Sequence, residues 1–126
     1  PYNNQTPTLP FSANYHIRWK ATGDYVNVET STGGAWATAS WNLALSGDVS
    51  RANDLVEFRI PLASIGATSG TVKVHMNMIN EDKPSNEWTF AGVPMGSFTD
   101  IKDPDYSKYF EFDLKGTTVP NAYSAK

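Results

Sequence analysis

Apolar and polar residues alternate along three segments, VEFRI (56–60), VKVHMNM (72–78) and FEFDL (110–114). Successive side chains of a β-strand point to opposite faces, so one face of each segment is expected to be buried and the other to carry polar groups. Glycine, proline and asparagine separate these segments from shorter runs of the same kind. Further strands are predicted at 14–20, 25–29, 36–45, 71–79 and 87–90, and one helical turn at 61–66. The pattern predicts an all-β protein, an antiparallel β-sandwich of the jelly-roll kind.

The length of 126 residues suits one domain with its own core. Residues 1–10 contain three prolines and no alternation, so they are predicted to form an extended arm. A single β-sandwich domain is expected over 11–115. Residues 116–126 are predicted to form a flexible tail.

Composition excludes several classes of function. The ten lysines and arginines are scattered and the net charge is -3, which argues against nucleic acid as a partner. No apolar run approaches the roughly 20 residues of a membrane span. The chain has no cysteine, so disulfides, thiol catalysis and thiolate metal sites are excluded. A surface rich in serine, threonine, asparagine and glycine is typical of secreted bacterial proteins that meet neutral polymers.

Two segments carry a resemblance to a known family. The stretch LVEFRIPLASIG (55–66) resembles a recurrent element of the DOMON-like and family-nine-like carbohydrate-binding modules, and LPFSANYHI (9–17) is similar to the motif that opens an earlier strand there. Asn14 stands where those modules usually have an acid. The resemblance implies a non-catalytic sandwich, extracellular or on a bacterial cell surface, that targets a polysaccharide-active protein to its polymer.

One departure from that family leaves a second interpretation open. Its members usually carry further strands upstream of the element at 9–17, and this chain has almost none there. The domain is then a trimmed variant, a domain that begins before this chain, or one that shares strands with another chain. The alternative function is therefore a structural or assembly subunit that exchanges strands at an open sheet edge.

Tryptophan is the natural contact for a sugar, since its flat apolar face matches the C–H face of a sugar ring. Alternation places Trp19 and Trp41 with aliphatic residues, which favours core packing, and leaves Trp88 ambiguous. Trp36 falls on a polar face beside two glycines and is the best candidate platform. If the strands join one sheet, its outer face adds groups that bond sugar hydroxyls, with an ordinary solvated face as the alternative. These candidate ligand-binding residues are Tyr25, Glu57, Arg59, His75, Asn77 and Glu111.

The loop DIKDPD (100–105) holds three carboxylates, Asp100, Asp103 and Asp105. A structural calcium site is one hypothesis, because calcium prefers several oxygen ligands from a flexible loop. Lys102 intrudes and the spacing matches no known calcium loop, so solvated turn acids are the favoured interpretation. No other cofactor is expected.

Two further interpretations are weaker. Some DOMON-type domains bind haem through methionine and histidine, and His75, Met76 and Met78 are close in sequence, but core filling by the methionines is the preferred interpretation. The segment 111–113 resembles the start of the E-x-D-x-x-E strand of jelly-roll glucanases, and its third acid is missing. We predict that the protein is not an enzyme.

Overall fold

The computed structural model describes residues 7–20, 23–45, 47–52, 55–82, 87–93, 105–115 and 122–125. Every ladder between strands in this part of the chain is antiparallel, and the helical content is a single short turn. The prediction of an all-β, antiparallel fold is therefore confirmed. Packing of the sheets into a sandwich stays a prediction.

The chain divides into two compact units, Ala13–Thr68 in one and Pro1–Ser12 with Ser69–Lys126 in the other. The predicted single domain over 11–115 stays a prediction. Among the described residues, no helix is long and apolar enough to cross a membrane.

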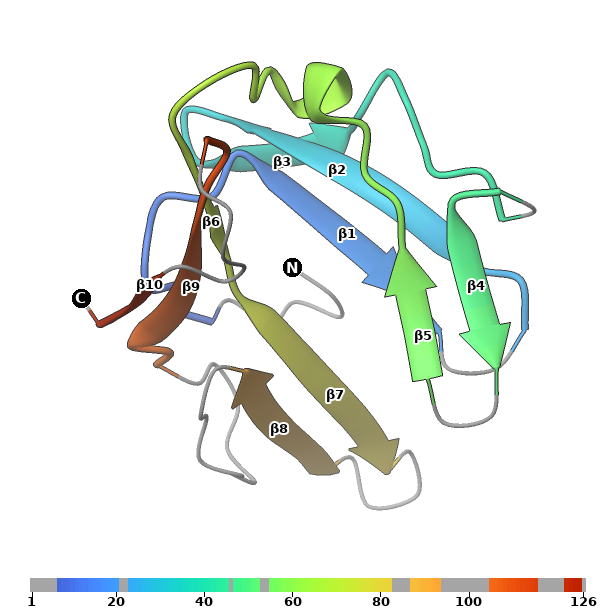
Figure 1. The fold of residues 1–126 in the computed structure, drawn as a ribbon. Helices are drawn as coiled ribbons and strands as arrows, with labels where there is room; N and C mark the ends of the chain where they lie inside the picture. Colours follow the sequence, from blue (N-terminus) through green and yellow to red (C-terminus); the bar gives the residue numbers. More distant parts are fainter. Residues whose placement is uncertain are drawn as a thin grey trace. The chain divides into compact units, whose positions relative to one another are not determined.

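The unit 13–68 is built on a three-stranded sheet in the order β1 (Tyr15–Trp19), β2 (Val26–Thr32) and β3 (Ala35–Thr38) (Figure 1). The predicted hairpin between the first two strands is confirmed. A two-residue turn, Gly33-Gly34, joins β2 to β3, with φ values of 60° and 86°. Positive φ at both positions is the mirror-image turn whose twist matches the strands it connects, and only glycine adopts it without strain.

β3 ends at Thr38, so the strand predicted over 36–45 is wrong beyond that residue. Beyond Thr38, side chains form hydrogen bonds with backbone groups in place of a neighbouring strand. Asn42 donates its amide to the Val26 carbonyl at 3.1 Å and accepts from the Leu43 N–H at 2.9 Å. Asp48 accepts from the Ala44 N–H at 2.9 Å. Asparagine and aspartate compete in this way with sheet ladders, which explains why the alternation does not continue as a strand.

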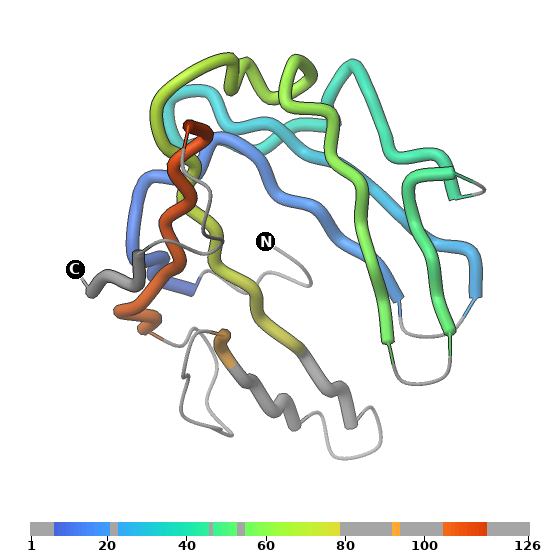
Figure 2. Tube along the Cα trace, viewed as in Figure 1, coloured from blue at the N-terminus to red at the C-terminus, as the bar shows by residue number. Residues whose placement is uncertain are grey.

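A second sheet of the same unit pairs β4 (Val49–Ala52) with β5 (Leu55–Phe58). We predicted β5, whereas β4 lies outside every strand that we predicted. After β5 comes the predicted turn, a 3-10 helix over Leu62–Ile65, which Figure 2 shows as a tight coil of the trace. Gly66 ends it in the left-handed conformation, φ 67°, and is the last residue of the turn predicted at 61–66.

The apolar face of the β1–β2–β3 sheet supplies the core of this unit. Val28 is fully buried, and Leu43 is 5% exposed. Trp19 meets Phe58 edge-on with ring centroids 4.7 Å apart, which links this sheet to β5. Trp41 packs against Tyr15 at 5.8 Å. Both tryptophans thus make the packing contacts that their alternation predicted.

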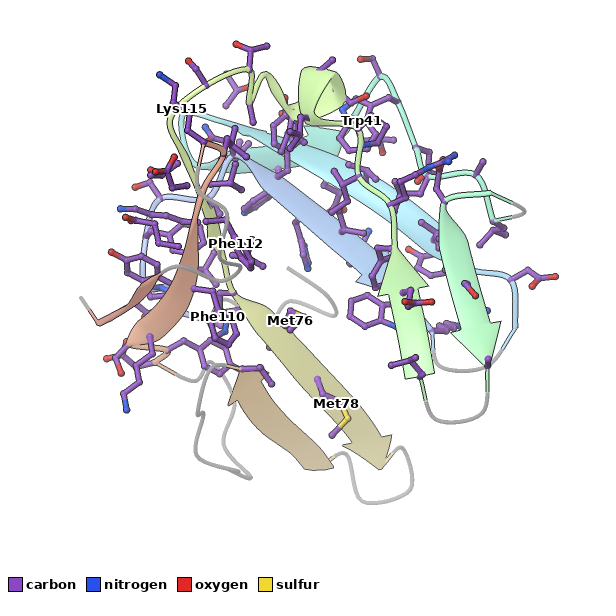
Figure 3. The ribbon with its side chains drawn as sticks, viewed as in Figure 1. Trp41, Met76, Met78, Phe110, Phe112 and Lys115 are labelled. Atoms are coloured by element: carbon purple, nitrogen blue, oxygen red, sulfur yellow. The ribbon has the colours of Figure 1, made fainter. Side chains whose placement is uncertain are left out.

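The other unit contains a sheet in the order β10 (Ala122–Ala125), β9 (Lys108–Asp113) and β6 (Thr71–Val74). Its register places Val72 opposite Phe112 and Val74 opposite Phe110, so these side chains share one face (Figure 3). β10 lies within the segment predicted as a tail. The N-terminal arm is attached by a parallel bridge between Thr8 and Asp105.

The predicted strand over 71–79 divides at His75, where the chain changes its pairing partner. β6 pairs with β9, whereas β7 (Met76–Asp82) pairs with β8 (Glu87–Val93). Met76 and Met78 follow the break on β7 (Figure 3), and they are 42% and 59% exposed. The interpretation of these methionines as core filling is therefore wrong.

Candidate functional site

One face of the β1–β2–β3 sheet carries most of the polar chemistry of the unit 13–68. Directly opposite residues of an antiparallel ladder lie on the same face, and the register pairs His16 with Glu29, Arg18 with Asn27, and Ser31 with Trp36. The backbone bond from the Lys20 N–H to the Tyr25 carbonyl, 3.3 Å, continues this ladder by one pair. We call this surface the polar face; it consists of His16, Arg18, Lys20, Tyr25, Asn27, Glu29, Ser31, Trp36 and Thr38.

Glu29 is the centre of the polar face. Arg18 Nη2 donates to Glu29 Oε1 at 2.6 Å, and His16 Nδ1 lies 3.3 Å from Glu29 Oε2. The side chains of Glu29 and Arg18 are 14% and 21% exposed, so this ion pair is largely shielded from water. Glu29 Oε2 is buried against His16, and Arg18 Nε is buried and makes no hydrogen bond. The cluster therefore keeps one donor unused.

His16 is the most exposed member of this cluster, at 31%. Burial lowers the pKa of its imidazole, because the charged form loses hydration, and the neighbouring Glu29 carboxylate opposes that shift. His16 is consequently neutral at pH 7. The charge of Arg18 is balanced by Glu29, so the middle of the polar face offers hydrogen-bonding groups without a net charge.

Trp36 lies at one end of the polar face, as its alternation predicted. It is half-buried and meets the His16 ring in a T-shaped contact, with centroids 5.7 Å apart and planes at 68°. This contact fixes the orientation of the indole relative to the cluster of His16, Arg18 and Glu29.

Tyr25 lies at the other end of the polar face and is 38% exposed. The Lys20 ammonium lies 5.6 Å from the centroid of its ring, a cation–π contact that occupies one face of that ring. Of the predicted ligand-binding residues, Tyr25 and Trp36 are thus the two that the structure places on one sheet face.

The other predicted residues do not join this sheet. Glu57 is an exposed residue of β5, opposite Ser50. Arg59 follows β5 and binds Asp48, with Nη2 2.8 Å from Oδ1. The Ala44 N–H and the Arg59 guanidinium lower the pKa of the Asp48 carboxyl. The ion pair joins Arg59 to the loop that contains Asp48, while the Arg59 side chain is 76% exposed.

His75, Asn77 and Glu111 belong to the other unit. His75 Nδ1 donates to the Lys108 carbonyl at 3.0 Å, and its ring lies 4.5 Å from that of Tyr106. Burial lowers the pKa of His75, so the ring is neutral and Nε2, which is buried, makes no hydrogen bond. Asn77 of β7 pairs with Gly92 of β8, and Glu111 of β9 pairs with Lys73 of β6.

Tyr106 is the most buried polar side chain beside His75. It is 5% exposed, and its hydroxyl makes no hydrogen bond. Burial raises the pKa of Tyr106 to about 12, since the phenolate would be stripped of water. Tyr106 and His75 pack as a pair of rings tilted by 44°.

Of the three aspartates in the predicted calcium loop, the structure describes only Asp105. Asp105 is exposed and bridges to Thr8, while Asp100 and Asp103 lie outside the described residues. Within the described part of the chain, no group of three or more histidines and acids is placed to hold a metal ion. The calcium site stays a prediction.

The charged cluster of His16, Arg18 and Glu29 was not among the predicted site residues. The signal for it was present in the sequence. The segments 14–20 and 25–29 form a hairpin with a four-residue turn, and extending the ladder from Lys20 and Tyr25 brings His16 opposite Glu29. Alternation alone, without this register, did not place Glu29 beside His16 and Arg18 of the preceding strand.

Comparison of the chain with protein-family models, with curated proteins and with solved structures finds no match. The assignment of function therefore rests on the polar face itself.

Proposed function

We propose that this protein is a non-catalytic carbohydrate-binding module, which binds a polysaccharide through the polar face and so targets an extracellular glycan-active protein to its polymer. The observation that carries the proposal is the contact of Trp36 with His16 beside the ion pair of Arg18 and Glu29. It places an aromatic ring next to hydrogen-bonding groups that carry no net charge. Sugar rings require this combination, since they offer a C–H face and hydroxyls that both donate and accept.

An unused donor of the cluster supports the same proposal. Buried polar atoms normally have a hydrogen-bond partner. Arg18 Nε has none, and its side chain retains some exposure. A sugar hydroxyl can accept from this N–H after a small shift of the side chain.

A titration with soluble neutral polysaccharides tests the proposal. Isothermal calorimetry is the suitable readout, because Trp36→Ala would itself change the fluorescence. We expect saturable binding to at least one glycan, its loss in Trp36→Ala, and partial retention in Trp36→Tyr, which keeps an aromatic face. Glu57→Ala, a change at an exposed residue of β5, is the matched control and should bind like the wild type. Absence of binding to every glycan tested would refute the proposal.

A second candidate, assembly by strand sharing, is favoured by the edges of the same sheet. Within the described strands, β1 and β3 each pair only with β2. β3 is short and uncharged, and an unprotected edge of this kind can pair with another chain. Ala37 is exposed on β3, so Ala37→Lys should abolish any self-association seen by light scattering. A wild-type protein that is monomeric at all concentrations would exclude self-assembly.

A further inference from the structure

The two aromatic residues of the polar face are too far apart to contact one sugar ring. Trp36 is opposite Ser31 of β2, and Tyr25 lies six residues before Ser31, immediately before β2 begins. At a rise of about 3.3 Å per residue, the two backbone positions are about 20 Å apart along the sheet, and the contact of the indole with His16, opposite Glu29, places its ring about 13 Å or more from the level of Tyr25. A mono- or disaccharide can reach one of them, whereas an extended chain can reach both.

The surface between the two rings is a continuous row of hydrogen-bonding groups. His16 and Glu29 form one pair across the strands, and Arg18 and Asn27 form the next. His16, Arg18 and Asn27 are each partly exposed. These side chains supply both hydrogen-bond donors and hydrogen-bond acceptors along the sheet between Trp36 and Tyr25.

We infer that the polar face takes an extended oligosaccharide, with one sugar stacked on Trp36, another on Tyr25, and the sugars between them bonded by His16 and Asn27. This inference rests on the proposed function and adds to it the length of the ligand. The Lys20 ammonium covers one face of the Tyr25 ring, so the sugar stacks on the opposite face. Because Glu29 balances Arg18, the middle of the row favours uncharged sugars, and Lys20 leaves one positive charge at the Tyr25 end.

Affinity as a function of chain length tests the inference. The probes are cello-, xylo- and manno-oligosaccharides of increasing length, from the single sugar upward, with calorimetry as the readout. We expect the affinity to rise with length until the chain reaches both rings and then to stay constant. Tyr25→Ala should weaken the longest chains about tenfold, the loss of one aromatic contact, and should leave the shortest unchanged. Trp36→Ala should weaken chains of every length.

Two controls test whether a weaker affinity of Tyr25→Ala comes from the lost sugar contact. They exclude misfolding and the general effect of removing an exposed side chain. Leu62→Ala removes an exposed apolar side chain, 46% exposed, from the helical turn of the same unit, and should leave the length dependence intact. The circular dichroism spectrum of Tyr25→Ala should match that of the wild type, since the side chain is exposed.

The possible outcomes distinguish this inference from the proposed function. Binding that is independent of length, or an unchanged affinity of Tyr25→Ala for the longest chains, would overturn the inference and leave the proposed function standing. Absence of binding to oligosaccharides and polysaccharides alike would overturn both. A length dependence that disappears in Tyr25→Ala would support both.

Discussion

His16 and Glu29 face each other across the β1–β2 ladder, with His16 Nδ1 3.3 Å from Glu29 Oε2. The other oxygen of the same carboxylate accepts from Arg18, one pair further along the sheet. Glu29 therefore holds two side chains of the neighbouring strand and sets the position of the ring against which Trp36 packs. The charged cluster and the aromatic contact form one structural unit on the polar face.

Glu29→Gln is expected to lower the free energy of unfolding by about 2 kcal/mol, because it leaves the largely buried Arg18 guanidinium without its counter-charge. Urea denaturation measures the change. Glu57→Gln is the matched control, since it alters an exposed carboxylate on β5, and it should change the free energy by less than about 0.5 kcal/mol. Equal effects of the two substitutions would show that the ion pair does not stabilise the fold.

Stability is expected to fall as the pH is lowered below about 6.5, the ordinary pKa of histidine. Burial lowers the pKa of His75 in the folded state, so the unfolded chain takes up the proton at a higher pH than the folded chain does. The stabilisation is complete above 6.5 and decreases as the pH falls toward the lowered value. His75→Asn, whose amide can still donate to the Lys108 carbonyl, should reduce this dependence.

His16 shifts in the same direction, so part of the pH dependence should remain in His75→Asn and disappear when His16→Asn is added. Urea denaturation at a series of pH values measures each slope. A slope that is the same in wild type and His75→Asn would contradict the assignment to His75.

Tyr106→Phe is expected to stabilise the protein by about 1 kcal/mol, because the substitution removes a buried hydroxyl that makes no hydrogen bond and keeps the ring against His75. In the wild type, an ultraviolet titration of the phenolates should show one late transition at a pH of about 12. Tyr106→Phe should lack this transition. A loss of stability in the variant would mean that the hydroxyl has a partner in solution.

Gly66→Ala is expected to cost about 1 kcal/mol, because an alanine at φ 67° brings its Cβ too close to the backbone. Thermal unfolding measures the cost. Gly47→Ala serves as the comparison, since the added Cβ would meet only Arg59 Nη2 at 3.7 Å, an ordinary contact, and φ there is not positive. A similar cost at both positions would exclude backbone strain as the cause.

Local patterns predicted a large part of the fold. The hairpin of β1 and β2, the strands β5 and β9, and the glycine stop at Gly66 all follow from alternation and turn residues within short stretches. β4 carried too weak a pattern to predict, since its four residues are ordered by pairing with β5. Pairing with a neighbouring strand determines whether such a short segment forms a strand, because its intrinsic β-propensity is small.

The candidate site was only half predictable. Alternation identified Trp36 and Tyr25 as residues of polar faces, but it grouped them with Glu57, Arg59, His75, Asn77 and Glu111 on the assumption of one sheet. The described strands form four separate sheets, and Arg59 is engaged by Asp48. The cluster around Glu29 required the register of the hairpin, which alternation does not contain.

The sequence by itself determined most of the strands, though not β4, β10 or the end of β3, and which face each of their side chains takes, because a period of two is a property of consecutive residues. Only the tertiary structure decided which strands pair. It set the residue at which the segment 71–79 stops pairing with β9 and starts pairing with β8, and it brought Glu29 into contact with both His16 and Arg18. Pairing depends on hydrogen bonds and packing between segments far apart in the chain, and many pairings satisfy the same alternation. The polar face exists because one of those pairings was selected.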